Sequence, residues 1–347
     1  MMTAFSDKIT RRSFLKASAG AAIFPLQSTK PDLAAIRTRA DWQKARTEIL
    51  ANLQLVMGEL PKQKHGKVEV VTLEQEDLPG YTRSKIKYLA EADDWVPAHL
   101  LMPKKESRRK PAMLCLHQTT KIGKDEPAGL GGNANLQYAR ELAERGYVCL
   151  APDYPYLGEN SFDPYRHGYA SCTMKGIVNH RRAVDLLQSL PQVAPNRIGA
   201  VGHSLGGHNT LFVAAFDERI RAMVTSCGFT SFPKYYKGDL TGWAGVRYMP
   251  RIAERYGKDP ARMPFDFPDI LAALAPRPLF INAPMHDSNF EVSGVQDCVA
   301  AATPIYQTIF NAKDALVAVY PNAGHEFPPE VRNQAWLFLD RWLKPSR

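Results

Sequence analysis

The sequence predicts an α/β fold built on a doubly wound, mostly parallel sheet of about eight strands. The chain of 347 residues can bury a large core, and 45% hydrophobic with 23% charged residues is ordinary for a globular protein. From residue 111 onward, short continuous apolar runs alternate with segments of helical periodicity. Such an alternation is typical of strands buried on both faces and the helices that connect them.

Residues 1–28 have the features of an export signal. The stretch "TRRSFLKASAGAAIF" places paired arginines before a short apolar run, which is too short to span a bilayer as a helix. This pattern resembles a twin-arginine signal and predicts a periplasmic or otherwise extracytoplasmic protein. A basic, mildly amphipathic N-terminal helix is the alternative. No later segment approaches membrane-spanning length, so we expect no stable membrane insertion after export.

Residues 29–347 are predicted to form a single domain that begins with a helical segment at 31–60. Three runs that alternate in strand fashion follow, with turn residues between them, and they predict an antiparallel start to the sheet. The later parallel part then follows in order. We expect strands at 67–75, 81–92, 95–103, 112–117, 147–153, 197–204, 220–228, 277–284 and 315–321, and helices at 134–146, 176–191, 206–216, 294–310 and 329–344.

Residues 228–275 interrupt this alternation and are rich in Tyr, Trp, Pro and Gly. A segment of this length between two core strands is usually functional, so we predict a lid-like insertion at the sheet edge where ligands bind. Its aromatic side chains offer a stacking surface for a sugar or an aromatic acyl group, or else form the core of the lid itself. The residues in question are Tyr235, Tyr236, Trp243 and Tyr248.

Ser204 is the predicted nucleophile. It is the central residue of Gly202-His203-Ser204-Leu205-Gly206, with an apolar strand before it and a helical segment after it. A sharp strand-to-helix turn lifts the serine hydroxyl out of the sheet and needs small residues around it. The following helix start also favours developing negative charge. A structural serine between two glycines is the alternative interpretation.

A serine hydroxyl needs an adjacent base. His325 in "VYPNAGHEFPPE" is the best placed histidine, because it follows the last predicted strand in a glycine-containing loop. The carboxylate that orients the base is expected after the preceding strand, where "PLFINAPMHDSNFEVSG" offers Asp287 first and Glu291 second. We predict Asp287 from its position, and Glu291 would then bind substrate or cap the next helix.

An oxyanion hole requires two backbone donors near the attacked carbonyl group. The N–H of Leu205, directly after the nucleophile, is one candidate. The second is expected from the loop after the first parallel strand, with Gln118 preferred over Thr119. His203 stands beside the nucleophile and is predicted to point away from it, as a pocket-lining or packing residue.

Other function classes lack support in the sequence. The net charge of +9 is partly due to residues 1–28 and to "KKESRRK" at 104–110, which is predicted to be a solvated loop, so we expect no nucleic-acid partner. The glycines of "GLGGN" lack the context of a phosphate loop, and no Cys/His group has zinc-ligand spacing. Five cysteines predict no disulfide framework. We therefore expect neither a cofactor nor a metal.

Taken together, these motifs resemble the α/β-hydrolase superfamily, and within it the dienelactone hydrolase and acetylxylan-esterase-like group. The residues that carry the resemblance are "LHQTT", "GYVCLAPDYPYLGE", "RIGAVGHSLGG", "APRPLFINAPMHD" and "YPNAGHEFP". The resemblance implies a Ser204, Asp287 and His325 triad. Dienelactone hydrolases proper use cysteine as nucleophile, so their substrate is not implied for this chain. The insertion is also longer than in the simplest members of the group, so the resemblance implies no substrate preference.

The leading hypothesis is therefore a serine hydrolase that cleaves carboxylic esters through an acyl-enzyme, on a small-molecule or glycan ester such as an acylated carbohydrate. A peptidase of the prolyl-oligopeptidase type, acting on short peptides, is the alternative enzyme. A third hypothesis is a binding protein that keeps the fold without chemistry.

Overall fold

The computed structural model describes residues 29–62, 67–104 and 109–344. The predicted export signal at 1–28 lies outside the described residues. Within them the sheet has nine strands, one at each of the nine ranges expected from the sequence, in the order β1-β2-β3-β5-β4-β6-β7-β8-β9. The strands are β1 (Val70–Asp77), β2 (Tyr81–Glu91), β3 (Asp94–Pro103), β4 (Lys110–Leu116), β5 (Val148–Pro152), β6 (Val193–His203), β7 (Ile220–Ser226), β8 (Leu279–Asn282) and β9 (Leu316–Val319).

The sheet begins antiparallel and continues parallel, as predicted. β1, β2, β3 and β5 pair antiparallel in turn, and every later pairing from β5 to β9 is parallel. β4 and β5 are buried at every residue, whereas β1 at the edge is exposed along its whole length. This arrangement, with helices on both faces, is the α/β-hydrolase fold.

In the part of the chain that the structure describes, eight α-helices accompany the strands, together with short 3₁₀ and π-helical turns. Two predicted helices are shorter than expected: the helix at 138–144 is preceded by a 3₁₀ turn, and the helix at 292–304 continues into a π-helical turn at 305–309. The helices are α1 (Arg39–Met57), α2 (Tyr138–Glu144), α3 (Cys172–Ser189), α4 (Leu205–Phe216), α5 (Arg251–Glu254), α6 (Phe267–Leu274), α7 (Val292–Pro304) and α8 (Pro329–Leu343).

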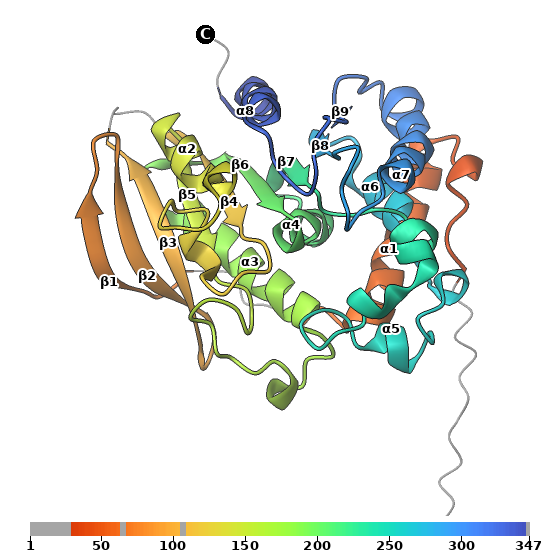
Figure 1. Cartoon of the computed structure of the whole chain (residues 1–347), viewed down its shortest axis with the longest axis horizontal. Coiled ribbons are helices and arrows are strands. Elements are labelled where there is room, and N and C mark those ends of the chain that lie inside the picture. The colour runs from red at the N-terminus through yellow and green to blue at the C-terminus, as the bar shows by residue number, and fades with distance from the viewer. Residues whose placement is uncertain (1–28, 63–66, 105–108, 345–347) are drawn as a thin grey trace, which may run out of the picture.

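Alternate strand residues serve two separate cores, because successive side chains of a strand point to opposite faces. Leu114 and Leu116 of β4 belong to the cluster formed with α3, α4 and α6. Met113 and Cys115 of the same strand belong to the cluster formed with α2 and α8. Figure 1 shows α2 and α8 on one side of the sheet and α3 and α4 on the other.

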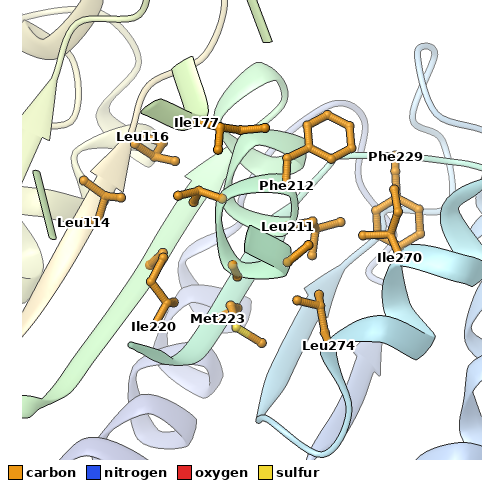
Figure 2. Packing of buried hydrophobic residues seen from close by; sticks show 14 of the residues in the cluster. Leu114, Leu116, Ile177, Leu211, Phe212, Ile220, Met223, Phe229, Ile270 and Leu274 are labelled. Atoms are coloured by element: carbon orange, nitrogen blue, oxygen red, sulfur yellow. The ribbon is translucent and has the colours of Figure 1, made fainter. Parts of the chain in front are cut away.

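α4 lies at the centre of the larger core. Figure 2 shows Leu211 and Phe212 of this helix between residues of β4 and β7 on one side and Ile270 of α6 on the other. Leu211 and Phe212 are fully buried. The helix that begins directly after Ser204 is thus held by apolar packing along its length, which fixes the position of its first turn.

The predicted insertion at 228–275 is only partly a separate excursion from the sheet. Its last part forms α6, which packs against α1, α4 and α7 and so belongs to the helical layer. The indole Nε1 of Trp42 in α1 donates to the carbonyl oxygen of Ala272 at 2.9 Å and ties the N-terminal helix to it. No helix within the described residues is long and apolar enough to cross a membrane.

Strand order brings the predicted site residues to one edge of the sheet. β4 lies between β5 and β6, and Leu116 of β4 pairs with Gly202 of β6. Gln118 and Ser204 each follow two residues later, so they leave the sheet at the same level. The loops after β8 and β9 emerge at this carboxyl edge too, because these strands are parallel to β7. Ligands bind at such an edge in open α/β sheets.

Candidate active site

Ser204 occupies the sharp turn between β6 and α4. Its backbone has φ 53° and ψ −117°, a conformation that is rare for a residue with a side chain, and its N–H donates to the carbonyl oxygen of Ser226 at 2.8 Å. A Cβ atom on Gly202 would lie 2.2 Å from backbone atoms of Gly206. A Cβ on Gly206 would lie 1.8 Å from the carbonyl oxygen of Leu116. The glycines are therefore required by close backbone approach.

Asp287 and His325 lie in direct contact. The Nδ1 atom of His325 is 2.9 Å from Oδ1 and 3.0 Å from Oδ2 of Asp287. The carboxylate is almost fully buried and also accepts the backbone N–H groups of Asn289 and Phe290 at 2.8 and 3.0 Å. Burial alone would raise the pKa of Asp287, but the hydrogen bond and charge of His325 and the two amides outweigh it and lower this pKa.

Glu291, the alternative acid, lies elsewhere. It is the residue before α7, is exposed, and accepts a hydrogen bond from the hydroxyl of Ser293. The structure thus brings Asp287, and not Glu291, to His325. Because Nδ1 of His325 is bonded to the carboxylate, Nε2 is the ring nitrogen that remains available to act as a base.

Ser204 and His325 line the same pocket of about 370 Å³, together with Leu205 and Gln118. The site residues predicted from two different loops and one helix start therefore converge on one cavity. A larger cavity of about 860 Å³ lies beside the end of α1 and residues 167–170, and it is lined by none of the predicted site residues. Choosing the candidate site by cavity volume alone would therefore select a cavity that contains no predicted site residue.

The loop after β4 is held in place by its side chains. His117 donates from Nδ1 to the carbonyl oxygen of Gln118 at 2.6 Å, while its Nε2 accepts the N–H of Tyr154 at 3.0 Å. The amide of Gln118 donates to both carboxylate oxygens of Glu126 at 3.1 and 2.9 Å. In the described part of the chain, the backbone N–H groups of Gln118 and Leu205 have no acceptor. Two free donors at the pocket suit an oxyanion.

The aromatic residues of the insertion divide into two groups. Tyr235, Trp243 and Tyr248 line the pocket, and Trp243 also packs against Phe232, Phe267 and Phe290. These residues belong both to the pocket wall and to the aromatic core of the insertion. Tyr236 does not line the pocket: it is 56% exposed and its hydroxyl donates to Oδ1 of Asn289 at 2.7 Å.

His203 does not line the pocket either, so of the two roles considered for it the structure agrees with packing and not with pocket lining. It is fully buried behind His325, with the two ring centroids 4.8 Å apart, and its Nδ1 is 2.9 Å from the hydroxyl of Ser226. Burial, followed by the nearby His325, lowers the pKa of His203 to about 3. His203 is a neutral packing partner of the predicted base.

A group that could hold a metal includes His203, Cys227 and His325, whose ligand atoms lie within 4.8 Å of one another. The thiol of Cys227 donates to the carbonyl oxygen of Glu326 at 3.3 Å. Burial raises the pKa of this thiol well above its usual range. Sγ of Cys227 and Nδ1 of His325 are already engaged within the protein, by the carbonyl oxygen of Glu326 and by the carboxylate of Asp287.

Four pocket residues were missed by the sequence analysis, namely His208, Gly242, Asn289 and Phe290. His208 is 3% exposed and lines the pocket one helical turn after Ser204, whose carbonyl oxygen accepts its N–H at 3.2 Å. Its spacing of four residues from the nucleophile was the available signal, because residues i and i+4 share one face of a helix.

Comparisons with known proteins agree with this fold. YtaP of Bacillus subtilis, whose name goes no further than a candidate hydrolase, is 26% identical over 320 residues, which cover 86% of this chain and 100% of YtaP. A glucuronoyl esterase from Solibacter usitatus superimposes with a TM-score of 0.70 at 17% identity, covering 90% of this chain and 97% of that one. An acetyl xylan esterase from Paenibacillus sp. R4 superimposes with a TM-score of 0.60 at 16% identity, covering 92% and 100%.

At such identities the two solved structures show a shared fold alone. A family match reaches further, because residues 133–346 match the prolyl oligopeptidase family, and this segment contains Ser204, Asp287 and His325. The match spans more than half of the chain. The protein therefore belongs to the prolyl oligopeptidase family within the α/β-hydrolase superfamily.

Proposed function

We propose that the protein is a serine hydrolase that cleaves carboxylic esters through an acyl-enzyme intermediate. Ser204 Oγ attacks the ester carbonyl carbon as His325 takes its proton, and the oxyanion binds to the N–H groups of Leu205 and Gln118. Collapse of the resulting tetrahedral intermediate expels the alcohol, which receives the proton from His325, and leaves the acyl group on Ser204. Water, deprotonated by His325, then cleaves the acyl-serine and releases the acid. Asp287 holds the imidazole in place and stabilises its charged form.

The observation that carries this proposal is that Ser204 and His325 line the same pocket. Ser204 stands on a strained turn at a helix start, His325 is oriented by the buried Asp287, and both line one pocket. Backbone strain of the kind seen at Ser204 costs stability and persists where a function requires it.

The pocket lining favours a neutral substrate. None of the residues that line it carries an Asp, Glu, Lys or Arg side chain. Binding a peptide by its charged amino or carboxyl terminus would call for an opposite charge. Aromatic rings and neutral hydrogen-bonding groups instead suit an uncharged ester, including an acylated carbohydrate. The names of the glucuronoyl and acetyl xylan esterases of similar fold agree with that class, and a twin-arginine signal would deliver the enzyme to extracytoplasmic substrates.

Cleavage of short peptides is the second candidate activity. The family match favours it, because the family is named for an oligopeptidase. The same nucleophile and base would serve an amide, with His325 protonating the leaving amine. A panel of esters and blocked short peptides measured side by side separates the two activities by their kcat/KM values.

The test of the nucleophile needs no knowledge of the substrate. A fluorophosphonate probe should label the protein once, at Ser204, as found by intact mass and peptide mapping. Labelling should vanish in Ser204→Ala and His325→Ala and persist in Ser293→Ala, a half-buried serine outside the pocket. A folded protein that does not react with the probe would contradict the hydrolase and favour a binding protein.

A further inference from the structure

Two polar ring atoms of residues that line this pocket have no hydrogen-bond partner among the described residues. They are Nε2 of His208 and Nε1 of Trp243, each unpaired among the described residues and almost without accessible surface. Both residues line the pocket of Ser204, and their ring centroids are 4.7 Å apart. Buried polar atoms of folded proteins are nearly always hydrogen-bonded, so two adjacent exceptions in a substrate pocket require an explanation.

The hydrogen-bonding role of His208 follows from its other nitrogen. Nδ1 lies 3.2 Å from the carbonyl oxygen of Gly228, which can only accept, so Nδ1 carries a hydrogen. Burial lowers the pKa of His208 to about 3, and the imidazole is therefore neutral near pH 7. In a neutral ring with its hydrogen on Nδ1, Nε2 bears a lone pair. It is an acceptor.

Trp243 has the opposite role, because an indole Nε1–H can only donate. Its ring is 2% exposed and is held on several sides by Phe232, Phe267 and Phe290. This packing leaves little freedom to turn the N–H toward another partner. The pocket wall thus carries a donor on Trp243 and an acceptor on His208, on two rings whose centroids are 4.7 Å apart, and His208 lies one helical turn after the nucleophile.

We propose that His208 and Trp243 form a hydroxyl-binding subsite, and that the substrate is an ester whose acyl or alcohol part carries a free hydroxyl group. A hydroxyl donates its hydrogen to Nε2 of His208 and accepts one from Nε1 of Trp243, which satisfies both atoms at once. A carboxylate would satisfy only the donor and an ammonium group only the acceptor. The inference rests on the proposed ester hydrolysis and narrows it to hydroxylated esters.

Matched esters test this on the unmodified protein. Each pair exchanges hydroxyl for a group of similar size: methyl 3-hydroxybutanoate with methyl 3-methylbutanoate on the acyl side, and 2-hydroxyethyl acetate with propyl acetate on the alcohol side. A third pair compares a 6-O-acetylated methyl glucoside with cyclohexylmethyl acetate. We expect kcat/KM to be about tenfold or more higher for the hydroxylated member of at least one pair, because its analogue leaves the two ring atoms unpaired. Equal values in all three pairs would overturn the subsite.

Two substitutions test whether the preference for hydroxylated esters depends on the rings of His208 and Trp243. Trp243→Phe keeps an aromatic ring and removes the N–H, and His208→Asn keeps a donor for Gly228 and removes the Nε2 acceptor. Each should reduce the hydroxyl-to-methyl ratio of kcat/KM about tenfold. Trp342→Phe is the matched control, because it removes an N–H from a 40% exposed indole ring of α8 outside the pocket, and it should leave the ratio at the wild-type value. A ratio that both pocket variants retain would overturn the assignment.

A binding measurement separates failure of this inference from failure of the proposed function. Methyl glucoside should slow fluorophosphonate labelling of Ser204 more than cyclohexylmethanol does, whether or not any ester is cleaved. Protection without ester turnover would support the subsite and contradict ester hydrolysis. Ester turnover without selective protection or hydroxyl preference would contradict the subsite and leave the hydrolase intact. Thermal unfolding of each variant checks that it folds.

Discussion

His325 Nδ1 lies 2.9 and 3.0 Å from the two carboxylate oxygens of Asp287, across a separation of 38 residues in the chain. A buried carboxylate in this position selects the tautomer of the imidazole and stabilises the imidazolium formed during catalysis. The contact decides between the two acids that the sequence left open near residue 290.

Asp287→Asn should lower kcat by about three to four orders of magnitude, because an amide in this position stabilises the wrong tautomer of His325. Glu291→Gln, a substitution of an exposed residue whose side chain contacts Ser293, is the matched control and should keep near-wild-type turnover. Steady-state kinetics on an ester substrate provides the measurement. The reverse pattern would mean that Glu291 orients the base.

Glu126 is expected to position the loop that supplies the second oxyanion donor. It is buried, and its carboxylate accepts the side-chain amide of Gln118 twice and the backbone N–H of Asn133 at 3.1 Å. Glu126→Gln keeps one acceptor oxygen. It replaces the other oxygen with an NH₂ group, which then faces an N–H donor that the lost oxygen accepted.

This change should lower kcat about ten- to hundredfold with little change in KM. The reason is that displacing the backbone N–H of Gln118 weakens binding of the transition state more than binding of the substrate. Glu144→Gln, an exposed glutamate that pairs with Arg140, is the control. An unchanged kcat in a folded Glu126→Gln variant would contradict the role of Glu126 in positioning this loop.

Gly206 is expected to tolerate no side chain. Its Cβ would lie 1.8 Å from the carbonyl oxygen of Leu116, a backbone atom held in the sheet. Gly206→Ala should therefore lower the free energy of unfolding by about 3 kcal/mol or more. Gly80→Ala, whose Cβ would meet no atom within 4 Å, should change it by less than about 0.5 kcal/mol. Urea denaturation compares the two, and equal stabilities would refute the close approach.

Asp269 in α6 should make stability depend on pH. Burial raises the pKa of Asp269 to about 7 from an ordinary value of 3.8, although the N–H of Asp266 opposes the shift. The folded state therefore holds a proton that the unfolded state releases, so stability falls as pH rises from about 4 to about 7, by at most about 4 kcal/mol.

Asp269→Asn is neutral at every pH and keeps an oxygen to accept the N–H of Asp266. It should raise the midpoint of thermal unfolding at pH 8, and the gain should disappear near pH 4. Asp314→Asn, at an exposed ion pair with Arg341, should show no comparable dependence on pH. A gain of the same size at pH 4 and pH 8 would exclude ionisation of Asp269 as the cause.

The sequence by itself determined the order of the elements and the position of the chemistry along the chain. Apolar periodicity is a local property, so the antiparallel start, the parallel strands and α4 after Ser204 could all be predicted. The positions of Asp287 and His325 followed from a topological rule, because the loops after parallel strands meet at one edge of the sheet. Their catalytic roles stay predictions.

Only the tertiary structure decided which side chains meet. Neither the burial of His203 behind His325, nor the exposure of Tyr236, nor the pairing of His208 with Trp243 can be inferred from spacing along the chain. These depend on the directions in which side chains leave segments that are remote in sequence, and on how the insertion packs on α4. The choice between Asp287 and Glu291, four residues apart in one loop, was decided in the same way. A loop has no period that would predict the direction of its side chains.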